Sequence, residues 1–250
     1  MDEWLQHHRW QGVDHFYLLD NGSTDNYTSV IGKHREYVTV IRNGTKHAQH
    51  EHLHTLWQLS AGARWLMEID LDEFVYARPR SGHHTIASYL HNLNSYFAST
   101  SYIQLYWHMF GSSGMYTQPK SVRQAFTRSA ADVTTLGKYI VRRSALHTPP
   151  HLQLHDATIK WGQRAQLKPK NAVLDLALNH YAIMSRQRFA AVKMTRGDAT
   201  AETLNHVRNI GYFDAYDKLG DEINNTELSE LVSKFSRQRA HPPGHRSRWR

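Results

Sequence analysis

Three carboxylates follow an apolar segment in the first third of the chain. They are Asp70, Asp72 and Glu73, and they come directly after 65–69, which reads as a short buried strand. In an open α/β sheet, side chains at the carboxyl end of a strand meet the edge where ligands bind. Carboxylates crowded in this way repel one another unless a cation offsets their charge, and Mg²⁺ or Mn²⁺ shares its ligands with phosphate. The spacing therefore predicts a divalent metal and a phosphate group.

Two other interpretations of these acids stay open. In the first, Asp70 caps a turn while Asp72 and Glu73 face water. In the second, Asp70 is the nucleophile of a metal-dependent phosphohydrolase and Asp72 is its acid. Phe74 fits this second interpretation badly, because phosphatases of the haloacid dehalogenase type have Thr or Val at that position.

The segments around the acids alternate between strand and helix patterns. Apolar runs bounded by glycine are typical of a mostly parallel sheet with crossover helices, so we predict an α/β fold. No internal repeat and no linker interrupts residues 1–235, which we expect to form one domain. The expected elements are helices over 4–10, 47–61 and 185–195, and strands over 13–19, 37–41, 65–69, 102–109 and 139–141.

Composition limits the environment of the site. The 250 residues include no cysteine, so any metal must be held by His, Asp or Glu, and a reducing compartment is expected. No apolar run reaches the roughly 18 residues of a membrane span, and the first residues lack the layout of a signal peptide. These features predict a soluble, cytoplasmic protein.

The net charge of +8 is concentrated in part at the end of the chain. Residues 236–250 carry five arginines and no acid, together with two prolines and a glycine. We expect a disordered basic tail that touches anionic lipid at most peripherally. Basic residues interleaved with aromatics on one folded face are not found, so no nucleic-acid partner is predicted.

The acidic segment resembles the D-x-D-E-F signature of the family 2-like and family 92-like glycosyltransferases. Other segments are similar to motifs of the same group, in the same order along the chain. They are Glu3-Trp4-Leu5 with His8 and 12–16 (EWL-x-x-H…GV-x-H-F), 20–25 (D-N-x-S-x-D), and 179–181 with Ser185, Phe189, Lys193 and Arg196-Gly197 (NHY…S…F…K…RG).

The resemblance implies a glycosyltransferase-A fold, a Rossmann-like sheet that binds a nucleoside diphosphate sugar, most often UDP-linked, with Mn²⁺ or Mg²⁺. It implies that Asp70, Asp72 and His180 lie at the metal, with Asp72 as the principal ligand. The nucleotide-binding positions that it implies are Asp20, Ser23, Asp25, Asp70 and Lys193.

These positions also have structural explanations. Asp20 begins a run of turn formers, and His180 can be a packed histidine beside Tyr181. Lys193 lies at the end of an expected helix, where a cation complements the helix dipole.

The activity implied is transfer of a sugar, with inversion, to a saccharide or glycoconjugate acceptor. An inverting enzyme needs a general base that takes the proton of the acceptor hydroxyl. Asp156 is the candidate, because it lies in a strand-poor stretch after Pro149 and Pro150 that suits an active-site loop. A non-catalytic relative that binds a nucleotide or a glycan is the further alternative.

The sequence departs from the family at its beginning. Members of the group have a strand before the helix that carries the EWL motif, and here Glu3 follows directly after Met1 and Asp2. We therefore expect the first strand to be missing, with an unpaired apolar edge and an incomplete wall of the nucleotide pocket.

Overall fold

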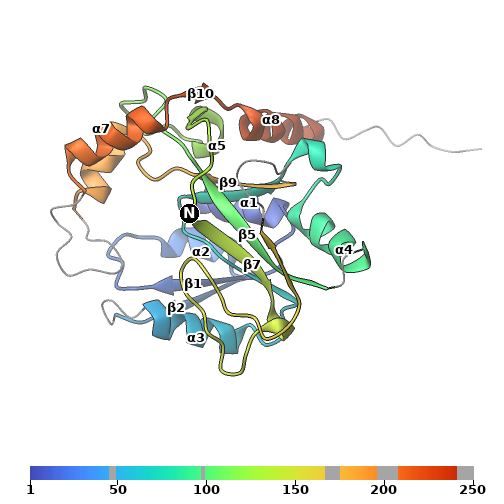
Figure 1. Ribbon diagram of the computed structural model, residues 1–250. Coiled ribbons are helices and arrows are strands. Elements are labelled where there is room, and N and C mark those ends of the chain that lie inside the picture. The colour runs from blue at the N-terminus through green and yellow to red at the C-terminus, as the bar shows by residue number, and fades with distance from the viewer. Residues whose placement is uncertain (45–48, 97–98, 167–174, 196–207, 241–250) are drawn as a thin grey trace, which may run out of the picture.

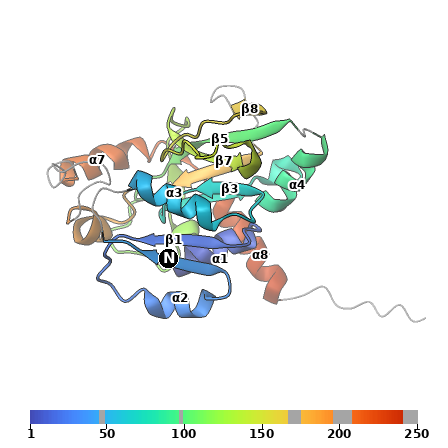
Figure 2. The ribbon, with the colours of Figure 1, turned by 90° about the horizontal axis from the view of Figure 1, so that it is seen from below.

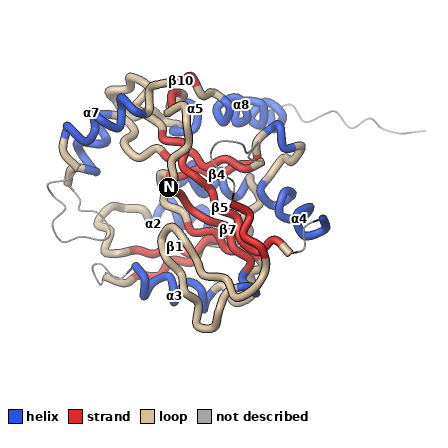
Figure 3. The backbone as a smooth tube through the Cα atoms, in the orientation of Figure 1, coloured by secondary structure: helices blue, strands red, loops and turns tan. Residues whose placement is uncertain are grey.

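The computed structural model describes residues 1–44, 49–96, 99–166, 175–195 and 208–240. Its strands gather at the centre with helices around them (Figure 3). The helices are α1 (Asp2–Trp10), α2 (Thr28–His34), α3 (Gln49–Leu59), η1 (Pro79–Ser81), α4 (Ile86–Tyr96), α5 (Val122–Ala125), η2 (Arg143–Ala145), α6 (Arg186–Arg188), η3 (Phe189–Lys193), α7 (Ile210–Leu219) and α8 (Glu227–Ala240). The strands are β1 (Phe16–Asp20), β2 (Val38–Arg42), β3 (Trp65–Glu68), β4 (Glu73–Ala77), β5 (Thr100–Met109), β6 (Arg128–Ser129), β7 (Gly137–Arg142), β8 (Gln163–Gln166), β9 (Leu176–His180) and β10 (Ile223–Asn224).

The central sheet has the order β3-β7-β5-β9-β4, with β8 beside β5. The long strand β5 crosses the middle of the molecule, pairing with β7 in the antiparallel and with β8 and β9 in the parallel direction (Figure 1). The pairs β3–β7 and β4–β9 are antiparallel. The predicted α/β class is confirmed, but the sheet is mixed rather than mostly parallel. An apolar run indicates a strand without fixing its direction, which depends on the connections between strands.

A second, two-stranded sheet holds β1 and β2, which run parallel with Phe16 opposite Val38. The helix α2 connects them, as a parallel pair requires. In the view of Figure 2, β1 and β3 are drawn one below the other. Within the described residues, β1 pairs only with β2 and β3 pairs only with β7, so each strand keeps one edge that no described strand covers.

The helix α1 covers the open edge of β4 with side chains in place of a strand. Nε2 of His7 donates to the carbonyl of Val75 at 2.7 Å, and the amide of Val75 donates to Nε2 of His8 at 3.2 Å. The amide of Ala77 donates to Oε1 of Gln11 at 3.0 Å. These bonds satisfy backbone groups that a buried sheet edge cannot leave unpaired. The spacing of the three polar residues therefore fixes the helix against the strand.

The two histidines of α1 adopt opposite tautomers. In His8, Nδ1 donates to the carbonyl of Trp4 at 3.0 Å, which leaves Nε2 to accept. In His7, Nε2 carries the hydrogen that it donates to Val75. Burial lowers the pKa of His8 to about 3, and burial likewise lowers the pKa of His7 well below its usual value. Both rings are therefore neutral at pH 7.

Most expected elements lie where the sequence placed them. The expected helix 4–10 is α1, the strand 102–109 lies inside β5, and the helix 185–195 is divided between α6 and the π-helix η3. Of the expected tail, residues 236–240 belong to α8, and 241–250 lie outside the described residues. Among the helices described, none combines the length and the apolar character that crossing a membrane requires.

Candidate functional site

The acidic segment forms a closed turn between β3 and β4. The amide of Asp70 donates to Oε2 of Glu73 at 2.9 Å, and the amide of Glu73 donates to the carbonyl of Asp70 at 3.1 Å. The indole Nε1 of Trp4 donates to the carbonyls of both residues, at 3.0 and 2.9 Å. The tryptophan of the EWL segment therefore holds the acidic turn in place.

The three acids do not share one environment, contrary to the expectation of one carboxylate cluster at the end of a buried strand. All four residues of β3 are only partly buried. Glu73 is the first residue of β4 and is fully buried, whereas the side chain of Asp70 is about half exposed. Only Asp70 and Asp72 therefore remain available to a ligand.

Asp72 is the centre of the candidate site. Its Oδ2 accepts a hydrogen bond from Nζ of Lys193 at 2.6 Å, and its Oδ1 lies 3.7 Å from Nε2 of His180. Burial acts to raise the pKa of Asp72, but Lys193 and His180 outweigh it and lower the pKa below its usual value. Asp72 is therefore an anion at pH 7, with a cation and an imidazole beside it.

His180 is nearly enclosed and keeps one nitrogen without a partner. Its Nδ1 is buried and makes no hydrogen bond to the described residues. Burial lowers the pKa of His180 despite the carboxylate of Asp72, so the ring is neutral at pH 7 and can act as a ligand. The predicted residues Asp72, His180 and Lys193 are thus brought together from distant parts of the chain.

Asp70 points to a different lysine. Its Oδ2 lies 3.1 Å from Nζ of Lys138, which also binds Oε2 of Glu68 at 2.8 Å. Lys138 is fully buried on β7. Burial acts to lower the pKa of Lys138, but Glu73, Asp70 and Glu68 outweigh it and raise the pKa. Sequence reasoning missed Lys138, although a lysine beside the apolar run 139–141 was a usable signal.

The residues fit a divalent cation in the type of donor but supply few donors. Asp72 and His180 offer an oxygen and a nitrogen, which Mn²⁺ accepts, and phosphate oxygens commonly complete such a shell. Within the described ranges, no three His, Cys, Asp or Glu side chains gather closely enough to hold a metal by themselves. Any cation at Asp72 would therefore depend on a ligand for most of its coordination.

Asp20 is fixed by bonds within its own turn. Its carboxylate accepts from the hydroxyl of Tyr27 at 2.6 Å, the amide of Ser23 at 2.7 Å and Nε of Arg42 at 3.0 Å. Bonds from Tyr27, Ser23 and Arg42 lower the pKa of Asp20. Ser23 and Asp25 line the cavity described next. A nucleoside contact by Asp20 stays a prediction beside this observed structural role.

A cavity of about 2010 Å³ joins these groups. It runs along the uncovered edges of β1 and β3, with Asp20 on its wall, and it reaches Asp72, His180 and Lys193. Because both strands expose an edge to it, the cavity is wider than the acidic site alone.

Asp156 lies away from the groups at Asp72. Its Oδ1 accepts from the hydroxyl of Tyr102 at 2.8 Å and from the amide of Ala157 at 2.7 Å. The residue does not line the cavity, whereas its neighbour His155 does. The structure therefore does not bring Asp156 to the other predicted site residues.

Trp107 connects the acidic turn to two histidines, and sequence reasoning did not identify it. Its Nε1 donates to Oε1 of Glu73 at 2.6 Å. Its ring centre lies 4.6 Å from that of His180 and 5.3 Å from that of His155. Burial raises the pKa of Glu73 well above its usual value. Nothing in the strand 102–109 distinguishes this tryptophan from one that packs in the core.

Comparison with known proteins agrees with the motifs of the acidic turn. The sequence model of glycosyltransferase family 92 matches residues 1–211. A protein of Ricinus communis described as a glycosyltransferase family 92 protein is 25% identical over 199 residues, which is 76% of this chain and 34% of the relative. The chain thus spans about a third of the length of this relative. It belongs to glycosyltransferase family 92.

Proposed function

We propose that the chain transfers a glycosyl group from a nucleoside diphosphate sugar, UDP-linked, to a saccharide or glycoconjugate acceptor with inversion. The observation that carries this proposal is the meeting of Asp72, His180 and Lys193 at one end of a large cavity in a family 92 chain. An anion, a neutral imidazole and a cation at one point suit a ligand that brings both a metal and phosphate.

The proposed chemistry places growing negative charge on the diphosphate as the anomeric C–O bond breaks. A bound Mn²⁺ or Mg²⁺ would offset that charge as a Lewis acid, with Asp72 and His180 as its protein ligands. Lys193 would turn from Asp72 to the phosphate oxygens, because its ammonium is one of the cations at that end of the cavity. Asp70, half exposed at the cavity, is proposed to lie near the ribose and the metal.

We also propose a fold of the glycosyltransferase-A type around this site. The parallel β1–β2 pair, joined by α2, supports it, because nucleotide-binding sheets are built from such crossovers. Asp20 at the carboxyl end of β1 would then lie on the nucleoside side of the cavity, with Ser23 and Asp25.

The test is release of UDP from a panel of UDP-hexoses and UDP-N-acetylhexosamines, with Mn²⁺ and with a chelator. The proposal predicts release from at least one donor with Mn²⁺, and its loss with the chelator. Binding of UDP without release from any donor, with or without saccharide acceptors, would instead support a non-catalytic nucleotide-binding relative.

A further inference from the structure

The loop after β7 brings one histidine to the cavity in a fixed position. The amide of Gln153 donates to the carbonyl of Asp156 at 2.8 Å, and the strand-like bridge between Leu152 and Ala157 closes the turn. The hydroxyl of Tyr139 donates to the carbonyl of Gln153 at 3.0 Å. This turn carries its tip, including His155, into the lining of the cavity.

The ring of His155 is anchored at one nitrogen. Its Nδ1 lies 2.9 Å from the carbonyl of Gly137, which can only accept, so Nδ1 carries the hydrogen. Gly137 packs closely against the neighbouring strand, since a Cβ added at this position would lie 1.8 Å from the carbonyl oxygen of Leu105. With the hydrogen on Nδ1, the free lone pair lies on Nε2, and the described part of the chain gives Nε2 no hydrogen-bond partner.

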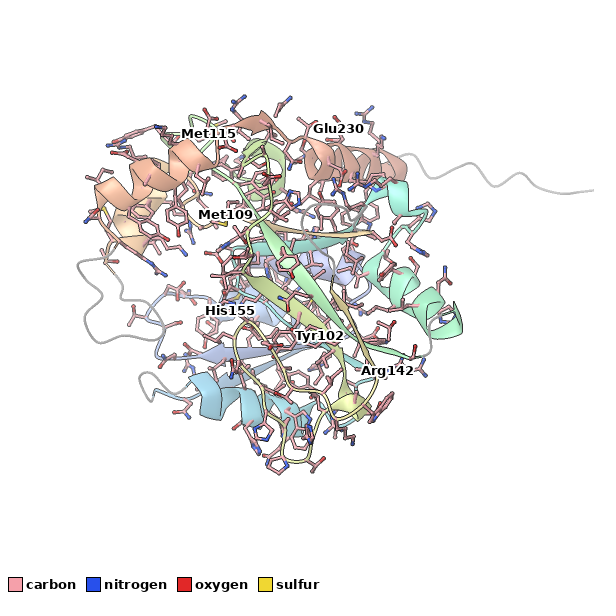
Figure 4. The ribbon with its side chains drawn as sticks, in the orientation of Figure 1. Tyr102, Met109, Met115, Arg142, His155 and Glu230 are labelled. Carbon is pink, nitrogen blue, oxygen red and sulfur yellow. The ribbon has the colours of Figure 1, made fainter. Side chains whose placement is uncertain are left out.

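The rings of His155 and His180 both pack against Trp107. The indole contacts the ring of His155 edge-on and the ring of His180 at a tilt. Figure 4 shows His155 to the left of Tyr102, on the side of the view where β1 ends. An inverting transfer needs its base apart from the leaving group, because the two act on opposite sides of the anomeric carbon.

The other bases at this end of the cavity already have charged partners. Asp72 binds Lys193, Asp70 binds Lys138, and His180 faces Asp72. Among the described residues, the hydrogen-bond partner of His155 is the carbonyl of Gly137, which holds the ring in the tautomer that a base requires.

We propose that His155 is the general base of the transfer, in place of Asp156; this inference rests on the proposed function. Nε2 takes the proton of the acceptor hydroxyl while the acceptor oxygen forms its bond to the anomeric carbon. The bond from that carbon to the diphosphate breaks, and its electron pair leaves with the nucleoside diphosphate. The proton remains on the His155 imidazolium and is then lost to water.

The experiment measures UDP release from the active donor, with Mn²⁺, for wild type, His155→Gln and His155→Ala. Water serves as the acceptor, because it too must lose a proton. We expect kcat to fall about 100-fold in both variants, with the KM for the donor within twofold of wild type. Added imidazole restores a part of the rate to His155→Ala, since it fills the space and takes the proton.

The matched control is His151→Gln, which changes an exposed histidine of the same loop that does not line the cavity. It should keep the wild-type rate and show no response to imidazole. A His155→Gln rate within threefold of wild type would overturn the assignment, and so would a loss that imidazole does not rescue. If wild type releases no UDP from any donor, the proposed function fails, and the role of His155 fails with it.

Discussion

Two lysines hold the two aspartates of the acidic turn, and each comes from a different part of the fold. Lys193 reaches Asp72 across 121 positions of sequence, and Lys138 reaches Asp70 from β7. Each lysine neutralises a carboxylate that would otherwise repel its neighbour. The pair at Asp72 lies at the site, whereas the pair at Asp70 also involves Glu68 and supports the sheet.

Replacing the buried lysine tests this supporting role. We expect Lys138→Met to lower the free energy of unfolding by about 3 kcal/mol, the low end for removing one partner of a buried ion pair. The loss stays at the low end because Asp70 is half exposed and because burial raises the pKa of Glu68 to about 7, which allows Glu68 to become neutral. Urea unfolding at pH 7 measures it.

The control for this variant is the double change Glu68→Gln with Lys138→Met. It removes both charges of the buried pair and should recover more than half of the lost stability. A loss below about 1 kcal/mol in the single variant, typical of an exposed ion pair, would contradict the supporting role.

At the scale of elements, α1 is the feature on which the site depends most. It satisfies the backbone edge of β4 and, through Trp4, holds the carbonyls of the acidic turn. The sequence predicts the helix and its buried face, since Trp4, Leu5 and His8 share one side. It does not predict the contact with β4, because His7, His8 and Gln11 read as ordinary polar residues until the strand edge beside them is known.

Acid should weaken the contact between α1 and β4. The pKa of His8 is lowered in the folded state to about 3, so the unfolded chain binds the proton first as pH falls below the ordinary value of about 6.5. The contribution of neutral His8 is therefore complete above about pH 6.5 and is lost as pH falls toward 3. We expect a slope of about 1.4 kcal/mol per pH unit from this residue alone.

His8→Gln should remove that slope between pH 6 and pH 4, because glutamine can accept from the same amide and does not titrate. Chemical unfolding across this range measures it, with the exposed His15→Gln as the matched control. Equal slopes in His8→Gln and wild type would show that His8 is not buried as a neutral ring.

The strands show where sequence reasoning was limited. The apolar pattern placed β5 and β7 correctly, but it left out β4 and β9, which pair with each other beside the site. The run that forms β4 follows the acids directly, so the sequence predicts Glu73 as a possible ligand. In the structure Glu73 begins β4 and lies in the core. A mostly parallel sheet was the wrong expectation for β3, which pairs with β7 in the antiparallel direction. The direction of a strand depends on long-range pairing that no local pattern contains.

At the scale of the whole molecule, one cavity joins the turn at Asp20 to the groups at Asp72. The resemblance implied that Asp72, His180 and Lys193 belong to one site, and the structure places their side chains beside one another. The ligand roles of these residues and of Asp20 stay predictions. Lys138 left a usable signal beside the apolar run 139–141, but its contact with Asp70 and that of Trp107 with Glu73 were not predictable, because only the fold makes these residues neighbours.

A ligand that fills this cavity should stabilise the whole chain. We expect UDP at about 100 times its dissociation constant, added to the chain already in Mn²⁺, to add about 2.7 kcal/mol to the free energy of unfolding. For a chain of this length, that corresponds to a rise in Tm of about 5–10 °C. Thermal unfolding measures it, with ADP and Mn²⁺ as the control for the diphosphate alone. A shift of equal size with ADP would contradict recognition of uridine, and no shift with either would contradict a diphosphate site.

The central claim is that Asp72 is the residue around which sugar transfer is organised. The most direct measurement is the rate of UDP release with Mn²⁺ for Asp72→Asn, which keeps the size of the side chain and removes its charge. The matched control is Asp132→Asn, at an exposed position that does not line the cavity. We expect a loss of at least about 100-fold in kcat for Asp72→Asn, with a Tm near that of wild type, and an unchanged rate for the control. A rate for Asp72→Asn within threefold of wild type would contradict it.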